Sequence, residues 1–92
     1  MRGTEKREIL DLENLRLKLT EAAAHGLSPT SRALESLSVP IGWLEAGADL
    51  ERDVLPSLAI VSRHQPKGTI QSWAYFSRPV AIARKRREAG LP

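Results

Sequence analysis

Apolar residues recur along the start of the chain at the spacing of helix faces. One row has its members three or four residues apart and a second row recurs every seven residues, and both spacings are typical of an amphipathic helix. The two rows are Leu12, Leu15, Leu19 and Ala22, and Leu10, Leu17 and Ala24. They predict one long helix from about Glu5 to His25, which Gly26 then ends in the left-handed conformation that glycine adopts most readily.

The leucines of this first helix cover more than one narrow row, so a monomer would leave part of them exposed. A contiguous exposed apolar patch often marks an interface. We therefore expect at least partial dimerisation through this helix, while a single long helix that covers a core is the alternative explanation of the same spacing. The candidate interface residues are Leu10, Leu12, Leu15, Leu17 and Leu19.

Proline and glycine divide the next part of the chain into short helical segments. Ser28 followed by Pro29 is a favourable helix start. We expect this second helix to end before Pro40, because the residue that precedes a proline avoids the helical conformation. One or two further turns are predicted from Pro40 to Ala46, with Gly47 as their stop.

A third helix is predicted after Asp53, with a short turn capped by Asp49 before it. Pro56 belongs in the first turn of this helix, where its missing N–H is tolerated. The helix carries Leu58, Ile60 and Val61 and ends near residues 63–64. A buried strand is rejected there, because the chain offers no second strand of similar character.

The last helix is predicted to begin at Thr69, after a loop over residues 65–68. Its aromatic residues are Trp73, Tyr75 and Phe76. Pro79 should kink or interrupt this helix, because proline removes a backbone donor and clashes with the preceding turn. The helix ends before Gly90.

These elements predict an all-α fold, a small irregular bundle of about four helices with a long first helix and a basic last helix. The chain of 92 residues is expected to form one small domain over residues 1–92, with fraying at 1–4 and 88–92. Hydrophobic residues make up 41%, which suffices for one modest core. The predicted core residues are Leu15, Leu19, Leu34, Trp43, Leu58, Val61, Trp73 and Phe76.

Several kinds of chemistry lack the residues that they need. The chain has no cysteine, which excludes a disulfide framework, a thiolate zinc site and a cysteine nucleophile. It has no glycine-rich phosphate loop, no serine in a catalytic context and no paired histidines. No enzyme activity, metal or cofactor is therefore predicted. The acids are interpreted as helix caps and solvated side chains, and they are Glu45, Asp49, Glu51 and Asp53.

The charge distribution gives the strongest functional signal. The net charge is +3, and four consecutive cations lie near the end of the chain, with Arg78 shortly before them. Four consecutive residues surround a helix, so these side chains cannot all pack on the core, and we expect the run to project from it. Such cations either complement the helix dipole, bind nucleic-acid phosphates or meet an acidic protein. The candidate nucleic-acid-binding residues are Arg78, Arg84, Lys85, Arg86 and Arg87.

Two stretches give the chain a family resemblance over about residues 41–85. They are Gly47-Ala48-Asp49-Leu50-Glu51 with Asp53-Val54-Leu55-Pro56, and Ile70-Gln71-Ser72-Trp73-Ala74-Tyr75-Phe76. In these residues the chain resembles the C-terminal region of helix-turn-helix proteins of alphaproteobacterial phages and plasmids that are associated with replication. The resemblance implies DNA transactions for the parent protein. It implies no catalytic residue.

The sequence therefore predicts a non-enzymatic, DNA-associated accessory module of a replication or transcription protein. Its basic last helix would bind the phosphates of duplex DNA with little sequence preference. The alternative is a protein–protein adaptor or a dimerisation module that acts through the leucine-rich first helix, in a homodimer or a larger complex. No apolar run approaches the length of a membrane span and no signal peptide is visible, so we expect a cytoplasmic protein without membrane contact.

Overall fold

Most of the described part of the chain is helical, as the sequence predicts. The computed structural model describes the backbone of residues 2–90 and the side chains of residues 11–90. Four α-helices and three short helical turns follow one another, with no strand among these residues. They are α1 (Arg2–Ala22), η1 (Arg32–Glu35), α2 (Ser38–Glu45), η2 (Leu50–Val54), α3 (Leu55–Arg63), η3 (Trp73–Phe76) and α4 (Ser77–Glu88). Met1 and residues 91–92, part of the ends predicted to fray, lie outside the described residues.

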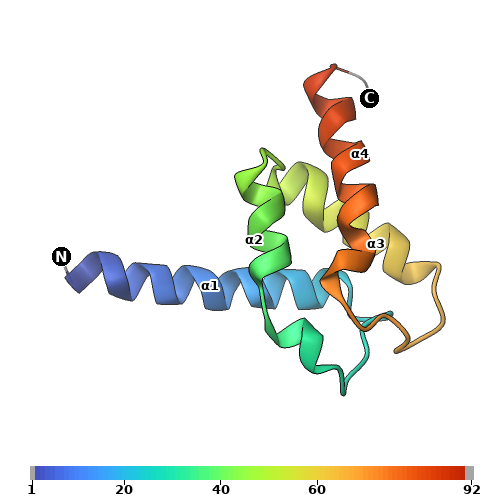
Figure 1. The fold of residues 1–92 in the computed structure, drawn as a ribbon, viewed down its shortest axis with the longest axis horizontal. Helices are drawn as coiled ribbons and strands as arrows, with labels where there is room; N and C mark the ends of the chain where they lie inside the picture. Colours follow the sequence, from blue (N-terminus) through green and yellow to red (C-terminus); the bar gives the residue numbers. More distant parts are fainter. Residues whose placement is uncertain (1, 91–92) are drawn as a thin grey trace.

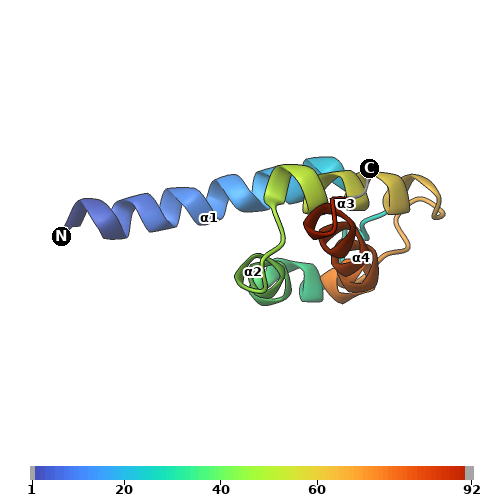
Figure 2. The same ribbon diagram turned by 90° about the horizontal axis from the view of Figure 1, so that it is seen from above.

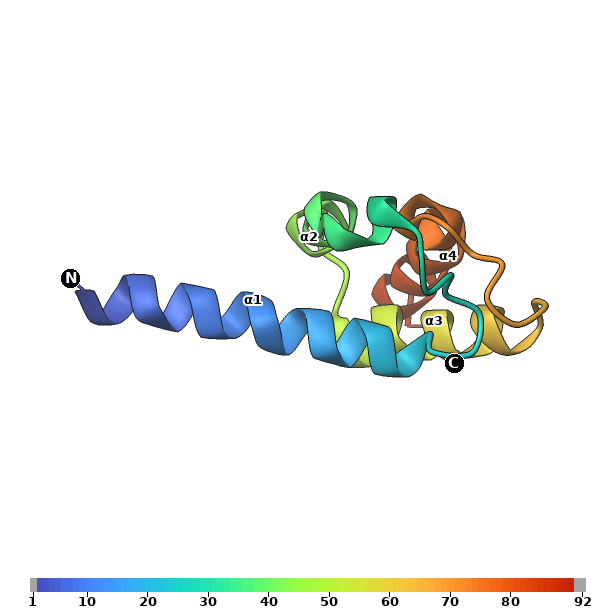
Figure 3. The ribbon, with the colours of Figure 1, turned by 90° about the horizontal axis from the view of Figure 1, so that it is seen from below.

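The four α-helices lie in two layers. Figures 2 and 3 show α1 and α3 in one layer and α2 and α4 in the other. The carboxyl-terminal half of α1 packs along α3, while its amino-terminal half extends away from the other helices (Figure 1). The molecule is therefore flat, with principal extents of 43 × 38 × 16 Å. No helix of the described part combines the length and apolar character needed to span a membrane.

The core lies between the two layers and contains most of the residues predicted for it. Trp73 and Phe76 are buried, with ring centroids 6.2 Å apart. The other predicted residues that are buried are Leu15, Leu19, Trp43 and Leu58. Leu34 and Val61 are only partly buried and pack against this core from its edge. The indole N–H of Trp43 donates to Ser77 Oγ at 3.0 Å, which ties α2 to the start of α4.

The predicted helix from Ser28 to Pro40 does not form. The chain after Ser28 is instead held by a distant segment, because the backbone N–H of Ser28 donates to the Ile70 carbonyl at 2.8 Å. Ser31 Oγ donates to the Gln71 carbonyl at 2.6 Å. The chain makes a turn at residues 29–30 before η1, and Pro40 stands in the first turn of α2 rather than after a helix. A proline is tolerated there because the first N–H groups of a helix have no partner within it.

The last helix likewise begins later than Thr69. Ile70 pairs with Leu27 in an isolated β-bridge: its N–H donates to the Gly26 carbonyl at 2.7 Å. Its carbonyl accepts from the Ser28 N–H, so that carbonyl is not free to accept the first bond of a helix. Ser72 caps η3 instead, with its hydroxyl accepting from the Ala74 N–H at 3.0 Å. Helix α4 starts at Ser77, which places Pro79 in its first turn, so proline interrupts nothing.

Two glycines stop helices as predicted, and a third has another role. Gly47 and Gly90 have positive φ, 110° and 74°, just after α2 and α4. Gly26 has no positive φ. Its N–H donates to Ser62 Oγ at 2.7 Å, and the close approach of α3 leaves no room there for a side chain. The left-handed cap predicted at Gly26 is therefore wrong, and packing accounts for the glycine.

Candidate functional site on the last helix

Helix α4 carries a high density of positive charge. Its 12 residues include five Lys and Arg residues and a single acid, Glu88. The helix is fixed to the molecule by Val80, which is 1% exposed in the core, and by polar contacts of two of its arginines. The five candidate cations therefore divide into two that hold the helix and three that do not.

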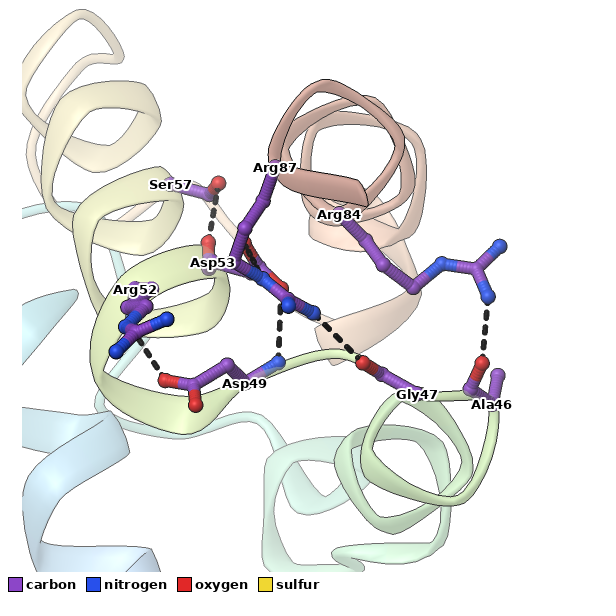
Figure 4. A network of polar contacts seen from close by, with 8 residues as sticks. All are labelled: Ala46, Gly47, Asp49, Arg52, Asp53, Ser57, Arg84 and Arg87. Carbon is purple, nitrogen blue, oxygen red and sulfur yellow. Dashed lines mark hydrogen bonds and ion pairs between the residues drawn. The ribbon is translucent and has the colours of Figure 1, made fainter. Parts of the chain in front are cut away.

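Arg87, whose side chain is half-buried, forms an ion pair with the buried carboxylate of Asp53 (Figure 4). Its Nε donates to both carboxylate oxygens, at 3.1 and 2.9 Å, and its Nη2 donates to the Gly47 carbonyl at 2.9 Å. Asp53 is 1% exposed, and its Oδ2 also accepts from the Asp49 N–H at 2.8 Å. A buried carboxylate is tolerated only when such partners replace its water. Arg87 is therefore part of the folded structure.

Arg84 faces the same loop from one turn earlier. Its Nη1 donates to the Ala46 carbonyl at the end of α2 (Figure 4). Because Arg84 and Arg87 are three residues apart, they share one side of the helix with Val80. The expectation that the whole run projects from the core is therefore wrong for these two residues.

The remaining three cations are exposed. Arg78, Lys85 and Arg86 lie on α4, and their side chains have no hydrogen bond or ion pair with any other described residue. Arg78 and Lys85 are two turns apart and so share one side of the helix. Arg86 lies closer to α3, where it lines a groove between the two helices. These three residues are the cations of α4 that are free to meet a partner.

The candidate interface residues on α1 also differ in their exposure. Leu15 and Leu19 are buried in the core of their own chain, 9% and 0% exposed, and so cannot belong to an interface. Leu12 and Leu17 are 46% and 55% exposed. The side chain of Leu10 lies outside the described residues. Only Leu12 and Leu17 are thus available, within residues 11–90, for contact with a partner.

The acids take the roles predicted for them, with one exception. Asp49 caps η2, its Oδ1 accepting from the Arg52 N–H at 2.8 Å. Glu45 and Glu51 are exposed, and Glu51 Oε2 forms an ion pair with Lys18 Nζ at 3.0 Å. Asp53 is buried and pairs with Arg87, 34 residues away, and no local pattern in the sequence indicates this partner. Within residues 11–90 no group of His, Asp and Glu side chains is placed to hold a metal ion.

Comparison with known proteins found no family model, no curated protein and no solved structure that matches this chain.

Proposed function

We propose that this chain is a non-enzymatic, DNA-associated module that contacts phosphates through Arg78, Lys85 and Arg86. The observation that carries the proposal is that the cations of α4 differ in their contacts. Two arginines are used to fix the helix, and three cations of the same helix are left exposed and unpaired within residues 11–90. A fixed helix presents its cations without the entropy cost of ordering a flexible tail.

The expected mechanism is the neutralisation of phosphates with release of counterions. Arg78 and Lys85 are separated by roughly 10 Å along the helix axis, so they can contact different phosphates of one duplex. Contacts of this kind position a protein on DNA but do not read its sequence. Arg84 and Arg87 act indirectly, by holding α4 on the loop after α2.

The context of this binding is also a proposal. The resemblance of residues 41–85 to replication-associated helix-turn-helix proteins supports a role beside a separate DNA-reading domain. Such a module would add affinity and leave the choice of site to the other domain.

A salt titration of duplex binding tests the proposal. Three phosphate contacts predict a slope of log affinity against log salt of about −2.7. Replacing Arg78, Lys85 and Arg86 together by Gln should flatten this slope and weaken binding equally for unrelated duplexes. Fluorescence anisotropy with labelled duplexes of two sequences measures both effects.

A matched variant separates the site from overall charge. Arg32, Arg63 and Lys67 are exposed cations outside α4, and their triple change to Gln removes the same charge. This control should keep most of the affinity. Equal losses in the two triple variants, or no binding by the parent chain at low salt, would overturn the proposal.

A second candidate function is protein–protein association through α1. The observation that favours it is the exposure of Leu12 and Leu17 on a helix whose amino-terminal half extends away from the other helices. Light scattering across micromolar concentrations, without nucleic acid, tests for self-association. A constant monomer mass would count against self-association through this helix.

A further inference from the structure

A groove with an apolar floor runs between α3 and α4. Its volume is about 820 Å³, within the usual range of binding sites. Two large apolar side chains stand on its walls, Ile60 on α3, 51% exposed, and Ile82 on α4, 47% exposed. The rest of the apolar lining consists of Pro56, Val61, Pro79 and Ala83. Exposed isoleucines that face one groove have no packing partner in a single chain, at least within its described part.

The edge of this groove is positively charged. Arg52 and Arg86 line it, both are exposed, and neither side chain pairs with another described residue. The third cation of the lining, Arg87, is already neutralised by Asp53, the only acid there. An apolar floor with unpaired cations at its edge fits the apolar face of a helix that carries acidic side chains beside it.

The chain itself contains a segment of this kind. Residues 8–14 include three acids and no Lys or Arg, although the chain as a whole is basic. Within that segment Asp11, Leu12 and Glu13 are exposed. They belong to α1, whose carboxyl-terminal part is fixed in its own core by Leu15 and Leu19. The amino-terminal half of α1 points away from α3 and α4 in all three ribbon views, so the segment does not reach its own groove (Figures 1 to 3).

We propose that the α3–α4 groove of one copy binds the acidic segment of α1, residues 8–14, of a second copy. Leu12 enters the groove between Ile60 and Ile82, while Asp11 and Glu13 face Arg52 and Arg86. This contact covers Leu12 on α1 and the two isoleucines of the groove, and it leaves Leu17 exposed. The proposal rests on the apolar and charge complementarity of two surfaces of the same chain, and it does not depend on DNA binding.

Crosslinking between single-cysteine chains tests the contact directly. The natural chain has no cysteine, so each introduced thiol is unique. A Leu12→Cys chain is mixed with an Ile60→Cys chain, or with an Ile82→Cys chain, and treated with a short bis-maleimide. We expect efficient crosslinked heterodimers in both mixtures. Leu17→Cys is the matched control, because Leu17 is equally exposed on α1 but lies outside the segment.

A charge exchange gives an independent measurement of the same contact. Asp11→Arg with Glu13→Arg in one chain, or Arg52→Glu with Arg86→Glu in another, should each weaken self-association by about tenfold, because like charges then face each other. A mixture of the two variants should form heterodimers with the parent affinity restored. Analytical ultracentrifugation without DNA measures the self-association of each charge variant and the formation of heterodimers in their mixture.

Three outcomes would overturn the proposal. The first is a parent chain that stays monomeric at high micromolar concentration. The second is crosslinking of Leu17→Cys that equals or exceeds crosslinking of Leu12→Cys, which would indicate that α1 contacts a partner by its other side. The third is a mixture of the two charge variants that does not regain affinity.

Discussion

At the scale of single residues, the glycine after α1 shows how a close contact determines a residue type. A Cβ atom at Gly26 would lie 2.7 Å from Ile70 Cδ1 and 2.9 Å from Ser62 Oγ. Ser62 is buried and donates to the Ala23 carbonyl at 2.9 Å, so it cannot move without losing that bond. Gly26→Ala should therefore lower the free energy of unfolding by about 1–3 kcal/mol. Urea unfolding measures the change.

The matched control is Gly42→Ala in α2. Gly42 is exposed and no atom lies within 4 Å of the position that its Cβ would take. Alanine should stabilise the protein there by about 0.5–1 kcal/mol, because glycine loses more backbone entropy in a helix. A Gly26→Ala protein as stable as the Gly42→Ala protein would contradict the packing explanation.

Trp73 is the largest fully buried side chain of the described residues. It is 2% exposed, and its indole N–H donates to the Leu34 carbonyl at 2.9 Å. Trp73→Ala should cost about 3–5 kcal/mol through the cavity it leaves. That is a large part of the roughly 5–15 kcal/mol that stabilises a small domain. Thermal melting followed by circular dichroism tests this, and an unchanged melting temperature would exclude Trp73 from the core.

At the scale of elements, the ion pair between α4 and η2 holds the last helix in place. Removing Arg87 leaves the buried Asp53 carboxylate with the Asp49 N–H as its remaining donor, and the loss of one partner of a buried polar group costs about 1–3 kcal/mol. Arg87→Gln should therefore destabilise the protein by about 1–3 kcal/mol, less than for a fully buried pair, because the Arg87 side chain is 31% exposed. Lys85→Gln removes the same charge from an exposed position and should change stability by less than about 0.5 kcal/mol. Equal unfolding curves for the two variants would show that the pair contributes nothing.

The elements also show which parts of the fold are visible in the sequence. Local signals predicted α1, the turns that became α2, and α3 with Pro56 in its first turn, because caps, prolines and apolar spacing act within one helix. They failed over residues 28–37 and 69–72, where Leu27 and Ile70 pair across the molecule. The Ser28 hydroxyl accepts from the Thr30 N–H, but only a turn forms there, because Ser28 and Ser31 are both bonded to the distant segment at Ile70 and Gln71.

Only part of the candidate site could be predicted from the sequence. The concentration of cations on the last helix is a property of the sequence alone, and so is the exposure of some of them. Which arginines turn inward depends on Asp53 and the carbonyls after α2, which are 34 to 40 residues away. Periodicity carries no information about such distant partners.

At the scale of the whole molecule, the proposed DNA-binding surface and the proposed α3–α4 groove share one side chain, that of Arg86. Arg78 and Lys85 belong only to the DNA-binding proposal, whereas Arg86 also lines the groove proposed to receive the second copy. A guanidinium that faces Asp11 or Glu13 of another chain is no longer available to a phosphate. Self-association and DNA binding should therefore compete for Arg86, whereas Arg78 and Lys85 stay available to DNA in both the monomer and the dimer.

This competition predicts that the effect of Arg86→Gln on the salt dependence differs between monomer and dimer. In dilute, monomeric protein the substitution should flatten the slope of log affinity against log salt by about 0.9, the contribution of one phosphate contact. In the dimer crosslinked between Leu12→Cys and Ile60→Cys chains, Arg86→Gln in both chains should leave the slope unchanged. Lys85→Gln should flatten it in both forms, since Lys85 lies outside the groove. Equal flattening by Arg86→Gln in monomer and dimer would show that the two surfaces do not share this residue.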